Sequence, residues 1–135
     1  MSERGDALAE RLFGALLGAI DVQNVYLGDR LGLYAALAEG GPTTSTELAA
    51  RAGIAERYAR EWLEQQAVGS IIDCDDTAAS ADARRYTLPP EYAEVLLDPD
   101  SRSHLVPAIR MIVAASQQLP ALMEAVAVHP ALAAN

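Results

Sequence analysis

Residues Thr43–Asp73, TTSTELAARAGIAERYAREWLEQQAVGSIID, contain the signals that decide the fold. Thr44 is followed three positions later by Glu47, the capping-box spacing that marks a helix start. A short helix is therefore expected to begin there and to end before Gly53, a residue that readily adopts a left-handed turn. Helical spacing of apolar residues resumes over residues 55–68. The stretch predicts two helices joined by a tight glycine turn.

Two short β-prone runs follow the second helix. They are Ser70–Asp73 and Arg85–Leu88, and the linker between them is rich in Asp, Ala and Ser. The simplest interpretation is a β-hairpin with a long loop. Two helices, a glycine turn and a hairpin in this order predict a winged helix-turn-helix with a two-stranded wing, within a mainly α fold.

Additional helices are expected on both sides of this winged unit. On the N-terminal side, helical spacing begins near Asp6 and continues to Leu37, before the breaker Gly40-Gly41-Pro42. On the C-terminal side we expect a short helix over Glu91–Leu97, a turn over Asp98–Ser101 that caps the next helix, and a separate helix starting at Pro120. The expected organisation is one domain with dimerisation helices in 1–40, the winged unit in 44–88 and C-terminal helices in 89–135.

Composition narrows the possible functions. The chain has 135 residues, of which 51% are hydrophobic, so it has enough apolar surface for one folded core. Its ten basic residues are all Arg, and nineteen acidic residues give a net charge of -9, which does not favour nucleic-acid binding. A single Cys and the lack of a secretory signal predict a cytoplasmic protein, and the apolar runs are too short or too interrupted to span a membrane.

A helix-turn-helix nevertheless raises DNA binding as an alternative function. The candidate contacts are Arg57, Arg60, Arg84 and Arg85, in the second helix and the wing. Acidic residues are interleaved with them, and Glu56 is placed four residues before Arg60, where the two can pair. The second helix is therefore better interpreted as a solvated, salt-bridged face, and nucleic acid is not an expected partner.

The sequence predicts no catalytic, cofactor-binding or metal-binding residues. It contains no GxGxxG motif, no P-loop and no acidic-x-Gly-x-Gly turn of the kind that holds S-adenosylmethionine. The run Asp73–Asp76 lacks the glycine and distal Glu of a calcium loop, and Cys74, His104 and His129 have no zinc-site spacing. The neighbouring residues Ser101, Ser103 and His104 have no assignable orienting carboxylate, and helix capping by Asp100 or Ser101 explains them better.

Small residues on the first helix point to an interface. Gly14 and Gly18 are four residues apart, which forms a groove that lets another backbone approach closely, either within the chain or from a second copy. The apolar C-terminal run from Leu105 to Val128 strengthens the second interpretation, a homodimer. The expected interface residues are Phe13, Gly14, Leu17, Gly18, Ile109 and Ile112. Tyr26 and Tyr34 are expected in the core or interface, and are also the candidates for a ligand pocket.

An ordered set of sequence blocks resembles the N-terminal winged-helix domain of a bacterial family of class I S-adenosylmethionine-dependent methyltransferases. The resemblance covers residues 8 to 125 and is carried by Val25–Tyr34, Thr46–Ala49, Glu56–Leu63, Arg85–Pro89 and Glu91–Leu96. It implies that the domain dimerises and covers a substrate pocket, while a following Rossmann-like domain binds the cofactor and performs the chemistry.

No such catalytic domain is recognised in these 135 residues, so the resemblance implies a chain that is not an enzyme by itself. S-adenosylmethionine would be a cofactor only together with the missing domain. The chain is then either a fragment of a methyltransferase or a stand-alone relative. Three functions stay open at this point: a non-catalytic dimerisation and substrate-cap domain, a winged-helix transcriptional regulator, and a small-molecule-binding module with its pocket between the N- and C-terminal helices.

Overall fold

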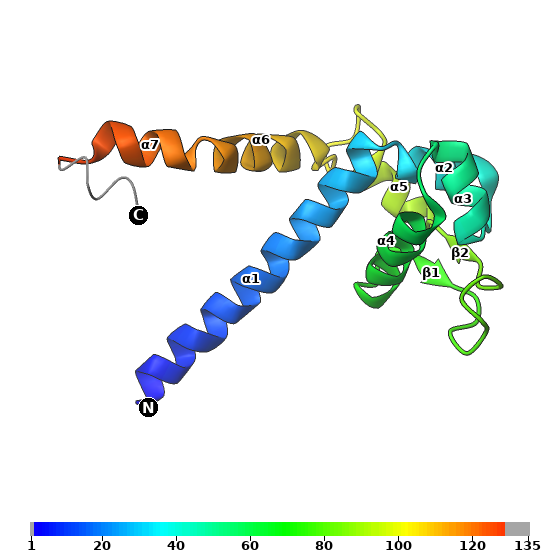
Figure 1. The fold of residues 1–135 in the computed structure, drawn as a ribbon, viewed down its shortest axis with the longest axis horizontal. Coiled ribbons are helices and arrows are strands. Elements are labelled where there is room, and N and C mark those ends of the chain that lie inside the picture. The colour runs from blue at the N-terminus through cyan, green and yellow to red at the C-terminus, as the bar shows by residue number, and fades with distance from the viewer. Residues whose placement is uncertain (1, 129–135) are drawn as a thin grey trace.

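The computed structural model describes residues 2–128, so His129 and the end of the predicted C-terminal region lie outside the described residues. The chain is mainly helical, with a two-stranded antiparallel hairpin after the fourth helix (Figure 1). The predicted winged helix-turn-helix is confirmed. The elements are α1 (Glu3–Arg30), α2 (Leu33–Gly40), α3 (Ser45–Ala52), α4 (Glu56–Val68), β1 (Asp73–Cys74), β2 (Tyr86–Thr87), α5 (Pro90–Leu96), α6 (Val106–Gln117) and α7 (Leu119–Val126).

The turn between α3 and α4 forms as its sequence predicts. The Thr44 side chain accepts a hydrogen bond from the backbone N–H of Glu47 at 3.2 Å, which caps the start of α3. The Glu47 carboxylate accepts from the Thr43 hydroxyl at 3.1 Å. Gly53 ends α3 with φ +69°, a left-handed conformation that a residue without a Cβ adopts at no steric cost.

The first strand starts later than predicted. Ser70 adopts a left-handed φ of +60°, and the backbone N–H groups of Ile71 and Ile72 donate to the carbonyl of Gln66 at 2.9 and 3.3 Å. These amides satisfy the C-terminal end of α4 and so are not free to pair with another strand. Strand pairing begins only at Asp73, and Thr43 adds a bridge to Tyr86 from the segment before α3.

The N-terminal helical region is divided at Leu31 and Gly32. α1 runs continuously to Arg30, and Gly32 then takes a φ of +71°, which turns the chain into α2. At its other end, the Ser2 hydroxyl accepts from the N–H of Gly5 at 3.1 Å and caps α1. At about 1.5 Å per residue, the 28 residues of α1 extend about 42 Å, well beyond the core.

The segment between α5 and α6 corrects one prediction. The turn at Asp98–Ser101 does not cap the next helix, because α6 begins only at Val106 and has no side-chain cap. The Ser101 hydroxyl instead donates to Glu94 at 3.0 Å and accepts from the N–H of Ser103 at 3.1 Å, which shapes the loop itself. Pro120 lies in the first turn of α7, as predicted.

The core lies where the C-terminal end of α1 meets α2, α3, α4 and the wing. Its members are mostly fully buried: Val25, Leu33, Tyr34, Leu37, Leu48, Trp62, Leu63, Ile72, Tyr86, Leu88, Leu96 and Val106. The winged unit therefore depends on α2 and the end of α1 to complete its core. None of the described helices is long and apolar enough to cross a bilayer.

Candidate functional site

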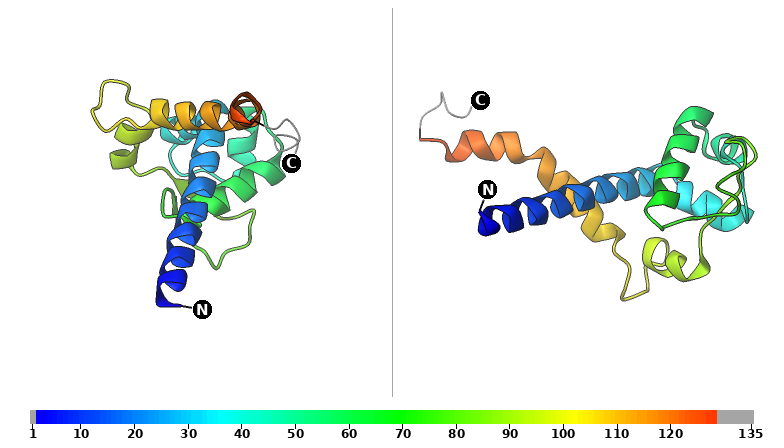
Figure 2. Two further views of the ribbon diagram at one scale, coloured as in Figure 1. Left: turned by 90° about the vertical axis from the view of Figure 1, so that its left-hand side faces the viewer. Right: turned by 90° about the horizontal axis from the view of Figure 1, so that it is seen from below.

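Two helical arms project from this core. The first arm is residues 3–24 of α1, and the second arm is residues 111–126 of α6 and α7. Both extend away from the winged unit, and no residue of either arm is buried (Figure 1, Figure 2). Such long unsupported helices need another surface to pack against, because most helix stability in proteins comes from packing.

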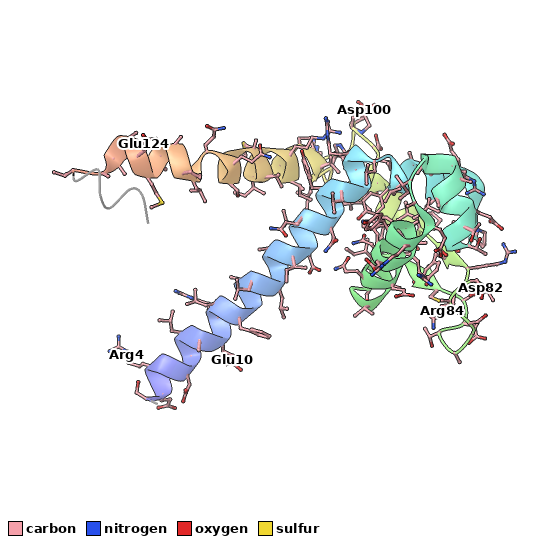
Figure 3. The ribbon with its side chains drawn as sticks, in the orientation of Figure 1. Arg4, Glu10, Asp82, Arg84, Asp100 and Glu124 are labelled. Carbon is pink, nitrogen blue, oxygen red and sulfur yellow. The ribbon has the colours of Figure 1, made fainter. Side chains whose placement is uncertain are left out.

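The arms carry most of the large exposed apolar side chains in the described residues. In the first arm, these side chains recur at helical spacing and are about half exposed: Leu8, Leu12, Phe13, Leu16, Leu17 and Ile20. The second arm adds a further set: Met111, Ile112, Leu119, Leu122, Met123 and Val126. Glu124 is the only charged residue in the second arm, and Figure 3 shows its position on α7. An exposed apolar surface of this extent is typical of a protein interaction site.

The glycine groove lies on the first arm. Beyond the neighbouring residues and the backbone of α1 itself, a Cβ atom built at Gly14 or Gly18 meets no atom of the described residues within 4 Å. Packing within the chain therefore does not explain why these two positions are glycine. It does explain Gly28, which faces the rings of Tyr34 and Trp62. Gly14 and Gly18 are open to a partner.

The remaining predicted interface residues differ in their exposure. Phe13 is 62% exposed, Leu17 50% and Ile112 54%, so all three present free apolar surface. Ile109 is half-buried and packs against the core within the same chain. The reason is its position in the first turns of α6, where this helix crosses the end of α1 (Figure 2).

An ion pair holds the two arms together at their base. The Arg110 guanidinium donates to both carboxylate oxygens of Asp29, at 2.6 and 2.8 Å. These hydrogen bonds raise the pKa of Arg110 above its ordinary value. Bidentate pairing of this kind fixes direction as well as distance. Neither residue was predicted as a site residue from the sequence. The one charged residue in the first half of an apolar helix, Arg110, was the feature that could have indicated an ion pair.

The four arginines considered for DNA contact are paired with carboxylates. Arg57 lies 3.2 Å from Glu61, and Arg60 lies 3.8 Å from Glu56 as its spacing predicts. At the wing, Arg84 lies 3.3 Å from Glu64 and Arg85 lies 3.8 Å from Glu47. Each positive charge is thus offset by a negative one on the surface that would have to meet a phosphate backbone.

The two tyrosines considered for a ligand pocket have different environments. Tyr34 is 1% exposed, stacks edge-on against Trp62 at a centroid distance of 5.1 Å, and donates its hydroxyl hydrogen to Gln66. It is a core residue whose polar group already has a partner. Tyr26 is half-buried on α1, one turn before Asp29.

Two hollows of the surface lie beside α4. One lies between α1 and α4, and its lining combines apolar residues such as Leu17, Ile20 and Val68 with acidic residues such as Glu61. Another lies beside Trp62, where Leu27, Leu31 and Tyr58 form an apolar wall. Tyr58 is 68% exposed, so it is not a core residue.

The residues considered for metal or nucleophilic chemistry have structural contacts. The Asp75 carboxylate accepts from the N–H of Arg85 at 2.9 Å, and Asp76 accepts from the N–H of Ala78 at 3.0 Å, so both stabilise the wing loop. The Nδ1 atom of His104 lies 2.9 Å from the carbonyl oxygen of Val95. Within residues 2–128, no three His, Cys, Asp or Glu side chains gather as a metal-ion site would require.

Comparison with protein families identifies a winged-helix family. Residues 18–97, more than half of the chain, match the model of the Rv2258c-like winged HTH domain. The matched region contains the end of α1, the helix-turn-helix, the wing and α5. Comparison with curated proteins finds no match to the sequence.

Solved structures of methyltransferases share the fold. Human N-acetylserotonin methyltransferase in complex with SAM has a TM-score of 0.66 at 16% identity, covering 91% of this chain and 36% of that one. CalO1, a methyltransferase in calicheamicin biosynthesis, has a TM-score of 0.58 at 24% identity, covering 96% and 35%. The mitomycin 7-O-methyltransferase MmcR has a TM-score of 0.56 at 23% identity, covering 88% and 36%. The chain spans about a third of the length of each. The resemblance to methyltransferase N-terminal domains is confirmed at the level of the fold.

Proposed function

The chain belongs to the Rv2258c-like winged HTH domain family, and from that premise we propose that it is a non-catalytic dimerisation and substrate-cap domain of the methyltransferase type. The observation that carries the proposal is the exposed apolar surface of the two arms. Neither arm contributes a buried side chain to the core of its own chain.

A second copy of the chain is the partner that fits this surface. Complete burial of a large apolar side chain contributes about 1.5–3 kcal/mol, so covering the six half-exposed side chains of the first arm contributes on the order of 5 kcal/mol. Gly14 and Gly18 allow a helix to approach at short distance there. A two-fold arrangement places the same surface of both copies in contact, so one set of residues covers the apolar surface of both copies.

The position of the first arm beside a hollow of α4 supports the proposed cap function. The hollow that contains Leu17 and Val68 is lined by the first arm on one side. A second copy packed on that arm would close this apolar space around a small-molecule substrate. The sequence has no glycine-rich cofactor motif, so we propose that the chain by itself does not bind S-adenosylmethionine, and calorimetry with that compound is expected to show no saturable heat.

Light scattering on the purified chain tests the dimer. We expect a dimer at micromolar concentration, and we expect Leu17→Glu to shift it to a monomer, because a carboxylate would be buried at the interface. Tyr92→Glu is the matched control, since Tyr92 is also exposed on a helix but lies on α5, outside both arms. A monodisperse wild-type monomer, or equal effects of the two substitutions, would contradict the proposal.

A further inference from the structure

We propose that the wing contains a second binding site, specific for a small neutral molecule that carries adjacent hydrogen-bond donor and acceptor groups, such as a carboxamide. The site is a hollow of about 250 Å³ between the C-terminal half of α4 and the hairpin. It contains no residue of either arm, although Glu64 and Val68 also line the hollow between α1 and α4. We call it the wing pocket and define it by Glu64, Ala67, Cys74, Arg84 and Tyr86.

The Tyr86 hydroxyl is the observation that points to a ligand. Tyr86 is 1% exposed, and its hydroxyl oxygen has no hydrogen-bond partner among the described residues. A buried hydroxyl without a partner costs free energy, and native proteins rarely leave one unsatisfied. Burial raises the pKa of Tyr86, and the neighbouring Arg84 guanidinium, which lies beside the hydroxyl without hydrogen-bond geometry, opposes that rise. At neutral pH the hydroxyl is protonated, so it can both donate and accept.

The neighbouring charges define what kind of molecule fits. Arg84 lies at the wing (Figure 3), where its Nε donates to the carbonyl of Ala79 at 3.0 Å and its Nη1 lies 3.3 Å from Glu64. This pair is neutral overall, so the pocket does not favour an ion of either sign. These bonds use one Glu64 oxygen and two of the five N–H groups of Arg84, so the pair can still accept from and donate to a ligand that presents a donor and an acceptor side by side.

Apolar side chains and a movable arginine form the rest of the wing pocket. Ala67 and Cys74 give an apolar wall on which a flat ring can lie. Arg84 is a partly exposed side chain next to the Tyr86 hydroxyl, so a rotation of its flexible chain that keeps the ion pair with Glu64 is what gives a ligand access. The carboxamide then takes the unused hydrogen bond of Tyr86 and contacts Glu64.

Titration of the full chain with benzamide, followed by NMR of the backbone amides, tests the wing pocket. We expect saturable shifts centred on Cys74 and Tyr86, with a dissociation constant on the order of a millimolar for so small a ligand. Acetophenone has the same shape but lacks the N–H donors, so it is expected to bind more weakly. Absence of saturation by benzamide, or equal binding of the two compounds, would overturn the proposal.

Two tyrosine variants separate a ligand site from a structural role. Tyr86→Phe is expected to weaken benzamide binding about five- to tenfold without lowering the midpoint of thermal unfolding, because the hydroxyl has no partner to lose. Tyr58→Phe removes an exposed hydroxyl outside the wing pocket and is expected to leave both readouts unchanged. A Tyr86→Phe variant that binds benzamide normally, or that unfolds at a lower temperature, would show that the hydroxyl already has another role.

Discussion

Tyr34 and Tyr86 are equally buried, but their hydroxyl groups have different surroundings. The Tyr34 hydroxyl donates to the side chain of Gln66, which is itself fully buried and donates to Gln65 at 2.7 Å. The Tyr86 hydroxyl has no such partner within residues 2–128. A hydroxyl in a satisfied chain of hydrogen bonds stabilises the fold, whereas an unsatisfied hydroxyl does not.

Replacement of Tyr34 by Phe is therefore expected to destabilise the protein. The substitution leaves the buried Gln66 oxygen without its donor, which costs about 1–3 kcal/mol in the free energy of unfolding. Urea denaturation at one fixed protein concentration measures this cost. Tyr92→Phe is the control, because Tyr92 is exposed and its variant should unfold like the wild type.

The same residue predicts a dependence on alkaline pH. Burial, with a smaller contribution from Asp29, raises the pKa of Tyr34 above its ordinary value of 10.0. The protonated Tyr34 hydroxyl contributes fully to stability below pH 10, where the folded and unfolded chains both keep the proton. Above pH 10 the unfolded chain loses this proton before the folded chain does, so the free energy of unfolding falls as pH rises. Tyr34→Phe should reduce that slope, and an unchanged slope would contradict the assignment.

At the level of the helices, α1 has two parts with different roles. Its C-terminal end packs into the core through Val25 and Gly28, whereas the first arm is exposed throughout. Three glycines mark the division: Gly28 faces aromatic rings, and Gly14 and Gly18 face open space. One helix thus joins the winged core to the surface proposed for dimerisation.

Alanine substitutions at Gly28 and Gly14 are expected to have opposite effects on folding. A Cβ at Gly28 would lie 2.5 Å from ring carbons of Trp62 and Tyr34, and the resulting overpacking, of about 1–3 kcal/mol, exceeds the gain of about 1 kcal/mol in helix propensity. Gly14→Ala meets no atom of its own chain, so it stabilises the helix but obstructs a partner's approach.

Denaturation and sedimentation together check this pair. The Gly28→Ala variant should unfold at a lower denaturant concentration than the wild type. Its folded form should dimerise with the same association constant. Gly14→Ala should instead weaken association while the helical content measured by circular dichroism is maintained. If Gly14→Ala leaves the dimer intact, the glycine groove is not part of the interface.

Across the whole molecule, the charge distribution argues against a role in binding DNA. The net charge is -9, and Arg57, Arg60, Arg84 and Arg85 each lie within 4 Å of a carboxylate. A DNA-binding surface requires excess positive charge to replace the counterions of the phosphates. The shared winged fold therefore does not by itself indicate DNA recognition.

A gel-shift experiment with duplex DNA from the region upstream of the gene is expected to show no retardation, even at low salt where electrostatic attraction is strongest. The informative comparison is with an Arg57→Ala/Arg60→Ala variant. Retardation of the wild type that this variant abolishes would favour the regulator interpretation over the cap domain.

Much of the architecture was predictable from local signals. The Thr44 cap, the Gly53 turn and the Pro120 helix start depend on interactions within a few residues, and the structure contains all three. The hairpin forms as predicted, but β1 begins at Asp73 and not at Ser70, because the Gln66 carbonyl accepts from the amides of Ile71 and Ile72. The predicted capping of α6 by the Asp98–Ser101 turn was wrong, because the Ser101 hydroxyl donates to Glu94.

The amino-acid sequence by itself determined the order of helices, turn and wing, the acidic charge and the presence of apolar helices at both ends, because these depend on composition and short-range periodicity. Only the tertiary structure decided which apolar residues are used within the chain. It buries Tyr34, half-buries Ile109, joins Asp29 to Arg110 and leaves the two arms uncovered. Helical periodicity identifies an apolar face, but burial depends on contacts between segments far apart in the chain, as between α1 and α6.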